Sequence, residues 1–321
     1  MRATLLPLGI DLGSSRLRVA YAERDRAGRP HVVAVAARDV EISLDTDADI
    51  DAAAAIVNEL ARETGAGVRS AVVAIPPSEA TIRVVHFPKM RWGERRRAAA
   101  FEAERFAGWD VKSVRTLVRV HSVNRAERLH AVGAVREAAL FARLRVLKRA
   151  GLRPAGVDYC AYALRRAFPQ ADAVLDVGFR RSVLYGFATD GPLAAALPGG
   201  GEFVTGAIGA ALSIERHVAE RRKRILGTAG AGEEARGELA SQAAAAIGKL
   251  RASIPVRRIA MTGNGARLCG FAADVESATQ ALVEVPVTDL LQGGPYPDDV
   301  VRAAAPDWAM AAALASWGAA T

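Results

Sequence analysis

Two short segments of the sequence place an aspartate, a glycine and a tight turn in the same order. The first segment, residues 8–15, reads LGIDLGSS, and the second, residues 173–180, reads AVLDVGFR. Each is followed by an apolar strand and a second glycine turn, at Ala27-Gly28 and at Asp190-Gly191. The distance between the two copies is far too long for a solenoid repeat, and it favours a duplicated domain.

These segments contain the groups that bind phosphate and magnesium. A glycine turn can direct several backbone N–H groups into one concavity, and the hydroxyls of Ser14 and Ser15 add further donors. A carboxylate at the end of a strand, such as Asp11 or Asp176, can hold a hydrated Mg²⁺ that bridges to phosphates. Two such hairpins facing each other would hold the phosphates of a nucleotide from both sides. The alternative is that both aspartates only cap their turns by accepting hydrogen bonds from nearby amides.

A third glycine-rich segment follows a short predicted strand at 258–261. It reads Thr262-Gly263-Asn264-Gly265-Ala266 and leads into a predicted helix that begins at about Arg267. Glycines let a backbone lie close to a flat ligand, and the start of a helix favours an anion. The spacing matches neither a Walker loop nor a dinucleotide fingerprint, which disfavours those two nucleotide folds. An ordinary loop between a strand and a helix is the alternative.

Short runs of β-branched residues, typical of strands, alternate along the whole chain with alanine-rich helical stretches. This alternation predicts an α/β architecture that would position the three segments. We expect strands at 6–11, 16–23, 31–40, 70–75, 81–87, 116–123, 129–135, 173–176, 182–189, 192–197 and 258–261. We expect helices at 51–63, 94–106, 136–150, 159–167, 202–220, 233–252 and 307–317.

The composition bounds the class of protein. The chain has 321 residues, 51% of them hydrophobic, and two cysteines, which excludes a disordered, collagen-like or disulfide-stapled protein. We expect Cys160 and Cys269 to be small core residues. No secretory leader is recognisable, and the longest uncharged apolar stretch, 308–320, is too short to span a bilayer. We therefore expect a protein of a soluble, reducing compartment.

The net charge of +8 consists mostly of arginine, because only five of the 43 basic residues are lysine. Together with abundant alanine, this usage is typical of a GC-rich genome. Runs such as Arg95–Arg97 and Arg221–Arg224 lack interleaved aromatic residues, so solvated helix faces explain them better than nucleic-acid binding does. Part of the charge could favour docking near an anionic membrane leaflet.

The three segments, in this order, resemble the nucleotide-binding motifs of the actin-like ATPase superfamily, which includes sugar kinases, DnaK-type chaperones and FtsA. Within it, the chain is most similar to the type IV pilus assembly protein M family (PilM). Residues 9–15 resemble the family's opening phosphate motif, with Arg18 where a lysine is usual. Residues 176–178 resemble the second phosphate motif. Residues 261–266 resemble the adenosine motif, with Asn264 in place of a glycine.

Other stretches extend this resemblance over most of the chain. Residues 74–76 and 87–90 resemble the family's two strands that each lead into a proline. The helix that ends at 101–106 resembles its W-E-A-E-x-Y helix, although Ala107-Gly108-Trp109 stands where Ile-Pro-Phe is usual. Residues 151–158 resemble a return strand into the first domain. The family's Gly-Gly helix start and its Ala-Glu-x-x-Lys helix are matched by Gly199-Gly200 with Thr205 and by Ala219-Glu220 with Lys223.

The second phosphate turn departs from the family pattern. Phe179, Arg180 and Arg181 stand where small or hydroxyl residues are usual. The two arginines could clamp phosphates with paired hydrogen bonds. A bulky Phe179 could instead narrow the cleft and leave a degenerate site that takes no ATP, and both alternatives stay open. Hydrolysis needs a residue that positions water, and the sequence identifies no catalytic residue; Arg216 and His217 are better explained as a solvated helix face.

The resemblance implies an α/β actin-like ATPase fold, in which two duplicated α/β domains surround a nucleotide cleft and the first carries an inserted α+β subdomain. It places the first domain at 1–68, with a return segment at 152–170 and a C-terminal helix at 306–321. The inserted subdomain is expected at 69–151 and the second domain at 171–305. The implied ligands are ATP and Mg²⁺, with Asp11 and Asp176 holding the metal through water. The implied cofactor-binding residues are Asp11, Gly13, Ser14, Ser15, Arg18, Asp176, Gly178, Arg180, Arg181, Gly199, Gly200, Gly263, Asn264 and Gly265.

The resemblance also implies a role and a partner. Members of this family are cytoplasmic scaffolds on the inner-membrane face of the type IV pilus machine, and they bind the N-terminal peptide of a PilN-like inner-membrane protein; self-association is a further option. The inserted subdomain would help to form the groove for an extended peptide. The candidate anchors are Phe87, Phe101, Phe106 and Trp109, within 81–90 and 101–109. The alternative is that these aromatic side chains only pack in the core. This alternative is favoured more for Phe101 than for Trp109, which follows the helix.

Two relatives of the same superfamily remain as rival functions. A small-molecule kinase would need a catalytic aspartate and a substrate pocket, usually in a longer chain. An FtsA-like division protein would end in an amphipathic membrane helix, whereas 307–317 is rich in alanine without a basic face and reads as a packing helix. Nucleic acid is not an expected partner.

Overall fold

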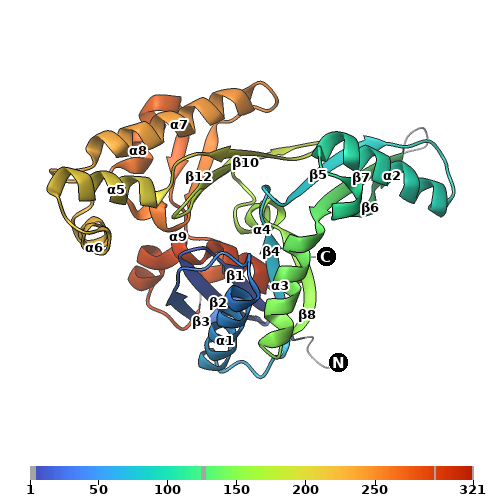
Figure 1. The fold of residues 1–321 in the computed structure, drawn as a ribbon, viewed down its shortest axis with the longest axis horizontal. Coiled ribbons are helices and arrows are strands. Elements are labelled where there is room, and N and C mark those ends of the chain that lie inside the picture. The colour runs from blue at the N-terminus through green and yellow to red at the C-terminus, as the bar shows by residue number, and fades with distance from the viewer. Residues whose placement is uncertain (1–4, 124–127, 293, 320–321) are drawn as a thin grey trace.

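A computed structural model describes residues 5–123, 128–292 and 294–319, and it shows two sheet-based lobes with a smaller subdomain extending from one side (Figure 1). The two lobes contain one five-stranded sheet each, and the smaller subdomain contains a three-stranded sheet. Within the described ranges, no helix is both long enough and apolar enough to cross a membrane.

The first sheet has the strand order β3-β2-β1-β4-β8. Its strands are β1 (Leu8–Leu12), β2 (Arg16–Arg24), β3 (Pro30–Asp39), β4 (Ser70–Ile75) and β8 (Arg153–Tyr159). β1 pairs antiparallel with β2 and parallel with β4, and β4 pairs parallel with β8. On one face, α1 (Asp47–Glu63) and α3 (Glu137–Arg149) bury their apolar sides against β1 and β2.

The second sheet repeats this plan with the order β11-β10-β9-β12-β13. Its strands are β9 (Ala173–Val177), β10 (Ser182–Ala188), β11 (Gly191–Leu197), β12 (Arg258–Thr262) and β13 (Leu282–Glu284). β9 pairs antiparallel with β10 and parallel with β12, as β1 does with β2 and β4. The outer face is covered by α5 (Gly201–Leu212), α6 (Arg216–Leu226), α7 (Glu233–Arg251) and α8 (Phe271–Thr279). The predicted duplication is therefore present in the topology.

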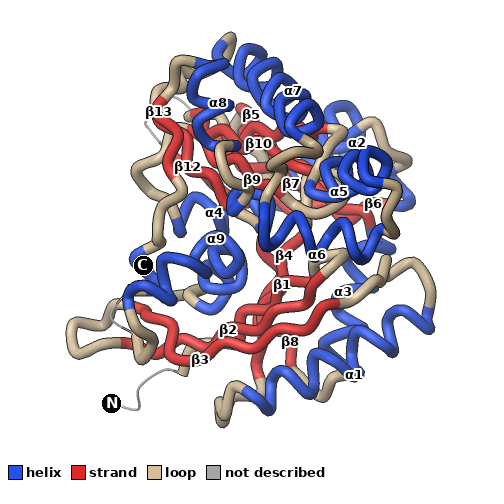
Figure 2. The backbone as a smooth tube through the Cα atoms, turned by 90° about the vertical axis from the view of Figure 1, so that its left-hand side faces the viewer, coloured by secondary structure: helices blue, strands red, loops and turns tan. Residues whose placement is uncertain are grey.

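Two helices, α4 (Cys160–Ala167) and α9 (Asp298–Ala315), pack between the two sheets. A single apolar cluster joins side chains of α4 and α9 to Val72 of the first sheet and to Val174 and Ala260 of the second. α9 lies so close to β1 that a Cβ at Gly9 would stand 2.1 Å from the carbonyl oxygen of Ala311. Figure 2 shows α9 on one side of the first sheet and α1 on the other.

The smaller subdomain consists of β5 (Ala80–His86), β6 (Val114–Val123) and β7 (Arg128–Arg136), in the order β5-β7-β6, with α2 (Trp92–Ala107) packed on one face. The expected insertion at 69–151 also contained β4 and α3. In the structure β4 lies inside the first sheet and α3 packs on α1, so the segment that leaves the first lobe is shorter at both ends than expected.

Several elements differ from their sequence-based expectations. The single helix expected at 202–220 is two helices, because Ser213 adopts the left-handed conformation (φ 52°) and ends α5. Helix α9 begins at Asp298, earlier than expected, and contains Pro306. Strand β13 has only three residues, too short for a sequence pattern to identify. The chain also includes the short 3₁₀ turns η1 (Val111–Ser113), η2 (Asn264–Arg267) and η3 (Asp289–Leu291).

The two cysteines differ in burial. Cys160 is buried at the start of α4, as expected. Cys269 is exposed, so the expectation of a core residue was wrong for it. It lies just before α8, in a surface turn, where the apolar neighbours in the sequence do not bring burial.

Candidate functional site

The two Asp-x-Gly hairpins have the same backbone geometry at each matching position. In the first hairpin Asp11 pairs across the strands with Arg18, and in the second Asp176 pairs with Val183. A Cβ at Gly13 would stand 2.7 Å from the carbonyl oxygen of Arg16, and one at Gly178 would stand 2.5 Å from that of Arg181. Because any larger residue would collide with its own turn, glycine is required at both positions.

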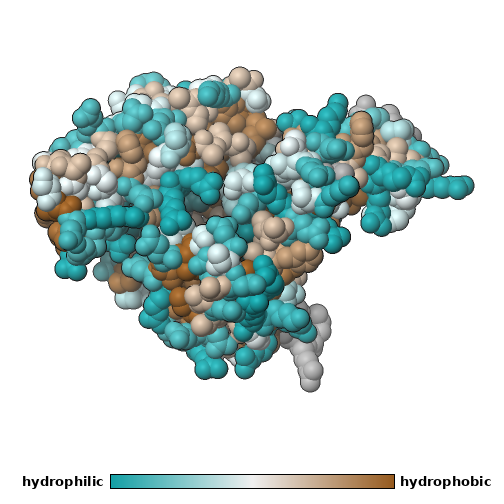
Figure 3. Space-filling view, viewed as in Figure 1, coloured by the Kyte–Doolittle hydropathy of each residue, from teal (hydrophilic) through white to brown (hydrophobic). Residues whose placement is uncertain are grey.

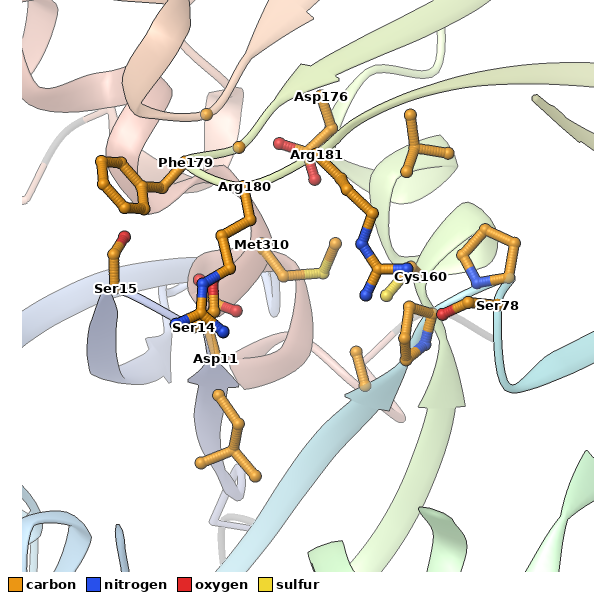
Figure 4. A pocket seen from close by; sticks show the side chains of 18 of the residues that line it. Asp11, Ser14, Ser15, Ser78, Cys160, Asp176, Phe179, Arg180, Arg181 and Met310 are labelled. Carbon is orange, nitrogen blue, oxygen red and sulfur yellow. The ribbon is translucent and has the colours of Figure 1, made fainter. Parts of the chain in front are cut away.

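The hairpins face each other across a cavity of about 570 Å³. Its walls include residues from both phosphate turns and from the third glycine-rich segment: Asp11, Leu12, Gly13, Ser14, Ser15, Arg18, Asp176, Gly178, Phe179, Arg180, Arg181, Thr262, Gly263 and Asn264. Figure 4 shows Asp11 and Asp176 on opposite sides of this space. Three segments that are far apart in the sequence therefore meet at one cavity.

Arg18 links the two lobes inside the cavity. Its guanidinium donates to the Asp11 carboxylate at 3.1 Å and to the side-chain oxygen of Asn264 at 2.5 Å. The residue is only 6% exposed. The bond to Asp11 follows directly from the β1–β2 register, whereas the bond to Asn264 crosses from the first lobe to the second. The second hairpin has Val183 at the matching position, so it has no arginine equivalent to Arg18.

Burial and mutual repulsion raise the pKa values of the two carboxyl groups. Burial raises the pKa of Asp11, and the charge of Arg18 opposes that rise. Burial, followed by repulsion from Asp11, raises the pKa of Asp176 to about 6, and Arg18 again acts in the opposite direction. Burial also raises the pKa of the nearby Cys160 thiol, with further contributions from both aspartates. The cavity therefore favours a cation or a proton at its floor.

The third segment lies directly against the second hairpin. Gly263 has φ 82°, and a Cβ there would stand 2.6 Å from the Asp176 carboxylate. A Cβ at Gly265 would stand 2.3 Å from the Val177 side chain. The Gly263 N–H donates to the carbonyl oxygen of Pro306 in α9, at 2.9 Å. Both glycines are therefore required by close backbone approach beside the carboxylate.

A second, smaller cavity of about 240 Å³ lies behind the second phosphate turn. It is lined by Gly265, Glu220 and Lys223 among others. Lys223 forms an ion pair with Glu220 at 2.7 Å and donates to the Thr205 hydroxyl at 2.7 Å. Burial lowers the pKa of Lys223, while the bond to Glu220 opposes that shift.

The sequence did not assign Glu220 and Lys223 to the site, although the resemblance of their helix to the family pattern was the signal that pointed to them. Gly199 and Gly200, which were assigned to it, support the second turn. Gly200 lies so close that a Cβ would stand 2.5 Å from the carbonyl oxygen of Phe179, and Gly201 is the glycine of this stretch that lines the smaller cavity.

The three bulky residues of the second turn point in different directions. Figure 4 shows Arg180 and Arg181 extending from the turn into the larger cavity, and Phe179 turned to its side, near Ser15. The Phe179 ring lies below two cations, 5.5 Å from the Arg216 guanidinium and 5.8 Å from the Lys223 ammonium. Phe179 lines both cavities, so it separates them at their boundary and leaves the larger one open.

The four candidate partner anchors occupy different environments. Phe87 is 6% exposed in the core of the smaller subdomain and lies 5.3 Å from the His130 ring. Phe101 is 66% exposed, so the expectation that core packing applied to it in particular was wrong: it lies on the outer face of α2. Trp109 is partly buried beneath the Arg136 guanidinium at 4.8 Å. Phe106 is partly buried, with the Arg83 guanidinium 5.6 Å from its ring.

Of these four aromatic residues, Phe106 lines a third cavity of about 800 Å³ between β5, α2 and the turn that joins β10 to β11. β5 is an edge strand of its sheet, and the N–H of Val84 donates to the carbonyl oxygen of Asp190 in that turn at 3.0 Å. The cavity therefore runs along the edge of β5, which the second lobe contacts through the β10–β11 turn.

The residues around the two adjacent cavities fit a nucleoside triphosphate with Mg²⁺. The glycines allow the turns and the third segment to pack tightly around the cavity floor, where a Cβ would collide with neighbouring atoms. Within the described ranges, no cluster of three or more His, Cys, Asp or Glu side chains surrounds a metal position. Two carboxylates alone suit an ion that keeps most of its waters and takes its remaining ligands from phosphates. Arg18, Arg180 and Arg181 supply the charge that phosphates require.

Comparisons with known proteins identify a family from the sequence and a fold from solved structures. The sequence model of the family described as type IV pilus assembly protein PilM matches residues 9–184. Among solved structures, the chain superimposes on a chain of the PilM-PilN type IV pilus biogenesis complex with a TM-score of 0.83, 23% identity and 99% coverage of each chain. A comparison with functionally curated proteins found no match.

Two further solved structures share the fold at lower similarity. The ethanolamine utilization protein EutJ from Carboxydothermus hydrogenoformans has a TM-score of 0.62 at 18% identity, over 98% of this chain and 90% of that one. The MamK double helical filament has a TM-score of 0.58 at 14% identity, over 97% and 98%. At such identities the likeness shows the fold alone, and it confirms the actin-like ATPase fold expected from the sequence.

Proposed function

Because the chain belongs to the type IV pilus assembly protein PilM family, we propose that it is a cytoplasmic, ATP-binding scaffold of a pilus or related secretion assembly at the inner membrane. Its partner would be the N-terminal peptide of a PilN-like membrane protein, since the similar solved structure is of a PilM-PilN complex. The observation that carries the nucleotide part is the meeting of two matched Asp-x-Gly hairpins and a glycine-rich segment at one cavity.

In this proposal the larger cavity holds the phosphates and the smaller one the nucleoside. Ser14, Ser15 and the turn amides would donate to phosphate oxygens, together with Arg18 and the two arginines of the second turn. Asp11 and Asp176 would orient the waters of Mg²⁺, which neutralises phosphate charge when it is bound. Gly265 and Lys223 line the space left for the nucleoside. To bind phosphate, Arg18 would replace part of its contact with Asp11 by a contact with a phosphate oxygen.

Calorimetry with ATP and Mg²⁺ tests the nucleotide part. We expect binding by the purified chain and weaker binding by Arg181→Met, because Arg181 lines the cavity and removing its charge removes a phosphate contact. The matched control is Arg62→Met, an exposed arginine at the end of α1, which should bind as the wild type does. Absence of binding at millimolar ATP would show that the cavity is degenerate, and the scaffold role would then not depend on nucleotide.

The third cavity is the proposed peptide groove. An extended peptide can add backbone hydrogen bonds to a strand edge and insert side chains beside it. β5 offers such an edge, and α2 supplies Glu102, Arg105 and Phe106 to the opposite wall. Phe101, five residues earlier on α2, is exposed but does not line this cavity.

Hydrogen exchange with the partner's N-terminal peptide tests this groove. We expect protection within 81–109 and in the turn at Asp190-Gly191, because residues of both segments line the cavity. Phe106→Ala should weaken peptide binding, whereas Phe141→Ala, which removes a 41% exposed ring on α3, should leave it unchanged. Protection only outside these segments would overturn the assignment of the groove, but not that of the nucleotide cavity.

A further inference from the structure

Helix α6 exposes apolar side chains that do not contribute to the core. Ala219 is the one residue of this helix that is buried, whereas Val218, Ile225 and Leu226 are 42%, 72% and 59% exposed. Amphipathic helices normally turn their aliphatic side chains toward the interior. In α6 they face solvent, which indicates a surface that binds something outside this chain.

The exposed side chains of α6 form a narrow stripe with arginines on both sides. Val218 and Ile225 are seven residues apart, which places them on one face of the helix. At 100° per residue, Arg221 lies to one side of the line between them and Arg222 to the other. We call Val218, Arg221, Arg222, Ile225 and Leu226 the α6 stripe. Three other basic residues of the helix, Arg216, Lys223 and Arg224, are paired with Glu202, Glu220 and Asp39. The stripe itself carries Arg221 and Arg222 and no acidic residue, so its own charge favours an anionic occupant.

The opposite face of α6 is already in use. Glu220 and Lys223 turn toward the smaller cavity, where they bond to each other and to Thr205. The α6 stripe therefore shares no residue with the proposed nucleotide site. A change in the stripe can be tested without removing a group that lines that site.

The stripe lies at a projecting end of the molecule. In Figure 1, α6 is at the far left, at the end opposite to the subdomain that contains α2. Figure 3 shows strongly hydrophobic and strongly hydrophilic atoms side by side at this end. The surface is an outward-facing helix at an edge of the molecule, and not a groove.

We propose that the α6 stripe docks on an anionic lipid bilayer, with Ile225 and Leu226 inserted at the level of the headgroups and the exposed Arg221 in contact with lipid phosphate. Basic residues beside a short aliphatic face are the composition of helices that lie in a membrane interface. An acidic protein is the other anionic occupant. A helix of this length measures only about 16 Å, and a stable protein interface needs about 800 Å² from each partner. A narrow protruding stripe suits shallow insertion into a flat surface better.

Vesicle sedimentation with the full chain tests the proposal. The probe is a vesicle of phosphatidylcholine with about one third phosphatidylglycerol, compared with phosphatidylcholine alone. We expect binding to the anionic vesicles that weakens as salt is raised, and little binding to the neutral ones. Equal binding to both vesicles, or no binding to the anionic ones at low salt, overturns the proposal. If the chain does not bind anionic vesicles even at low salt, an acidic protein becomes the expected occupant of the stripe.

Substitutions within the stripe separate insertion from charge attraction. Ile225→Ser with Leu226→Ser should weaken binding at least about tenfold, because less apolar area leaves water. Arg221→Gln should weaken it roughly fivefold. Arg222 is left in place because it donates to the carbonyl oxygen of Ala229 and holds the turn after α6. Val300→Ser, which changes a 50% exposed residue of α9, is the matched control and should bind normally.

A dye at position 225 reports insertion directly. In a Cys269→Ser background, which removes the exposed thiol, an environment-sensitive dye is attached to Ile225→Cys or, as the control, to Val300→Cys. Anionic vesicles should shift the emission of the dye at 225 to shorter wavelength and leave that at 300 unchanged. Full binding of the Ile225→Ser, Leu226→Ser variant, or the same shift at both positions, overturns the insertion of α6.

Discussion

At the scale of single residues, Arg18 balances the charges of the candidate site. Its position opposite Asp11 is set by the β1–β2 register, and its bond to Asn264 depends on how the two lobes are placed. The sequence identified Arg18 as a phosphate ligand because of its place in the motif. It could not predict the bond to Asn264, because that contact joins residues 246 positions apart and no local pattern encodes it.

Replacing Arg18 with methionine should destabilise the fold. The change leaves the partly buried Asp11 carboxylate without its ion-pair partner and removes the nearby positive charge that Asp176 senses. Breaking a buried ion pair on one side costs about 3 kcal/mol. Urea unfolding at pH 7 measures this loss. Arg18→Lys is the control, since it keeps the charge while losing part of the hydrogen bonding, and it should cost only about 1 kcal/mol. An equal loss in both variants would show that shape, and not charge, is what matters at this position.

The raised pKa of Asp176 predicts how stability depends on pH. The folded carboxyl titrates near pH 6 and the unfolded one near 3.9, so the folded state binds its proton more tightly. Its contribution to stability is full below about pH 4 and is lost as the pH rises through 6, by up to about 3 kcal/mol. Asp176→Asn removes this loss, so the variant should be more stable than the wild type at pH 8.

The measurement for Asp176 is the difference in free energy of unfolding between the two proteins from pH 4 to pH 8. Taking the difference cancels the titration of the other groups that both proteins share. We expect the gap to be close to zero at pH 4 and to grow through pH 6. A gap that does not change with pH would contradict the raised pKa.

At the scale of elements, local patterns predicted the hairpins and failed where tertiary contacts decide. The strands β1, β2, β9 and β10 appear within two residues of their expected ends, because each is a short, largely apolar segment next to a glycine turn. The break between α5 and α6 was missed, since Leu212-Ser213-Ile214 contains no glycine or proline. The pocket role of Lys223 was missed because it depends on the direction of α6 after that break.

The left-handed Ser213 predicts a stabilising substitution at the same break. A non-glycine residue at φ 52° is strained, and Ser213→Gly removes this strain at some cost in chain entropy. We expect a gain of about 0.5 kcal/mol in thermal or urea unfolding. Ala252→Gly at the end of α7 is the matched control, because Ala252 has a right-handed conformation (φ −67°); there the change should destabilise by about as much. A loss in both variants would contradict the assignment of strain.

At the scale of the whole molecule, the sites are separated by the fold. The cavities proposed for the nucleotide lie between the lobes, the proposed peptide groove lies at β5 and α2, and the α6 stripe lies at the far end (Figure 1). The sequence predicted two lobes and an insertion, because the duplicated motif and the family resemblance both mark them. It did not predict that α4 and α9 share one core with both sheets, since that packing depends on how the lobes close.

The separation of groove and stripe predicts that they act together at a membrane. Because they share no residue, saturating the groove with free partner peptide should leave binding to anionic vesicles unchanged. Anchoring the same peptide in the vesicle should instead raise the apparent affinity by about 10²–10⁴, since the second contact becomes intramolecular. Vesicle sedimentation of the wild type and of the Ile225→Ser, Leu226→Ser variant measures both effects. The variant should bind anchored peptide only as tightly as free peptide, and equal enhancement in the two proteins would show that α6 does not reach the bilayer when the groove is occupied.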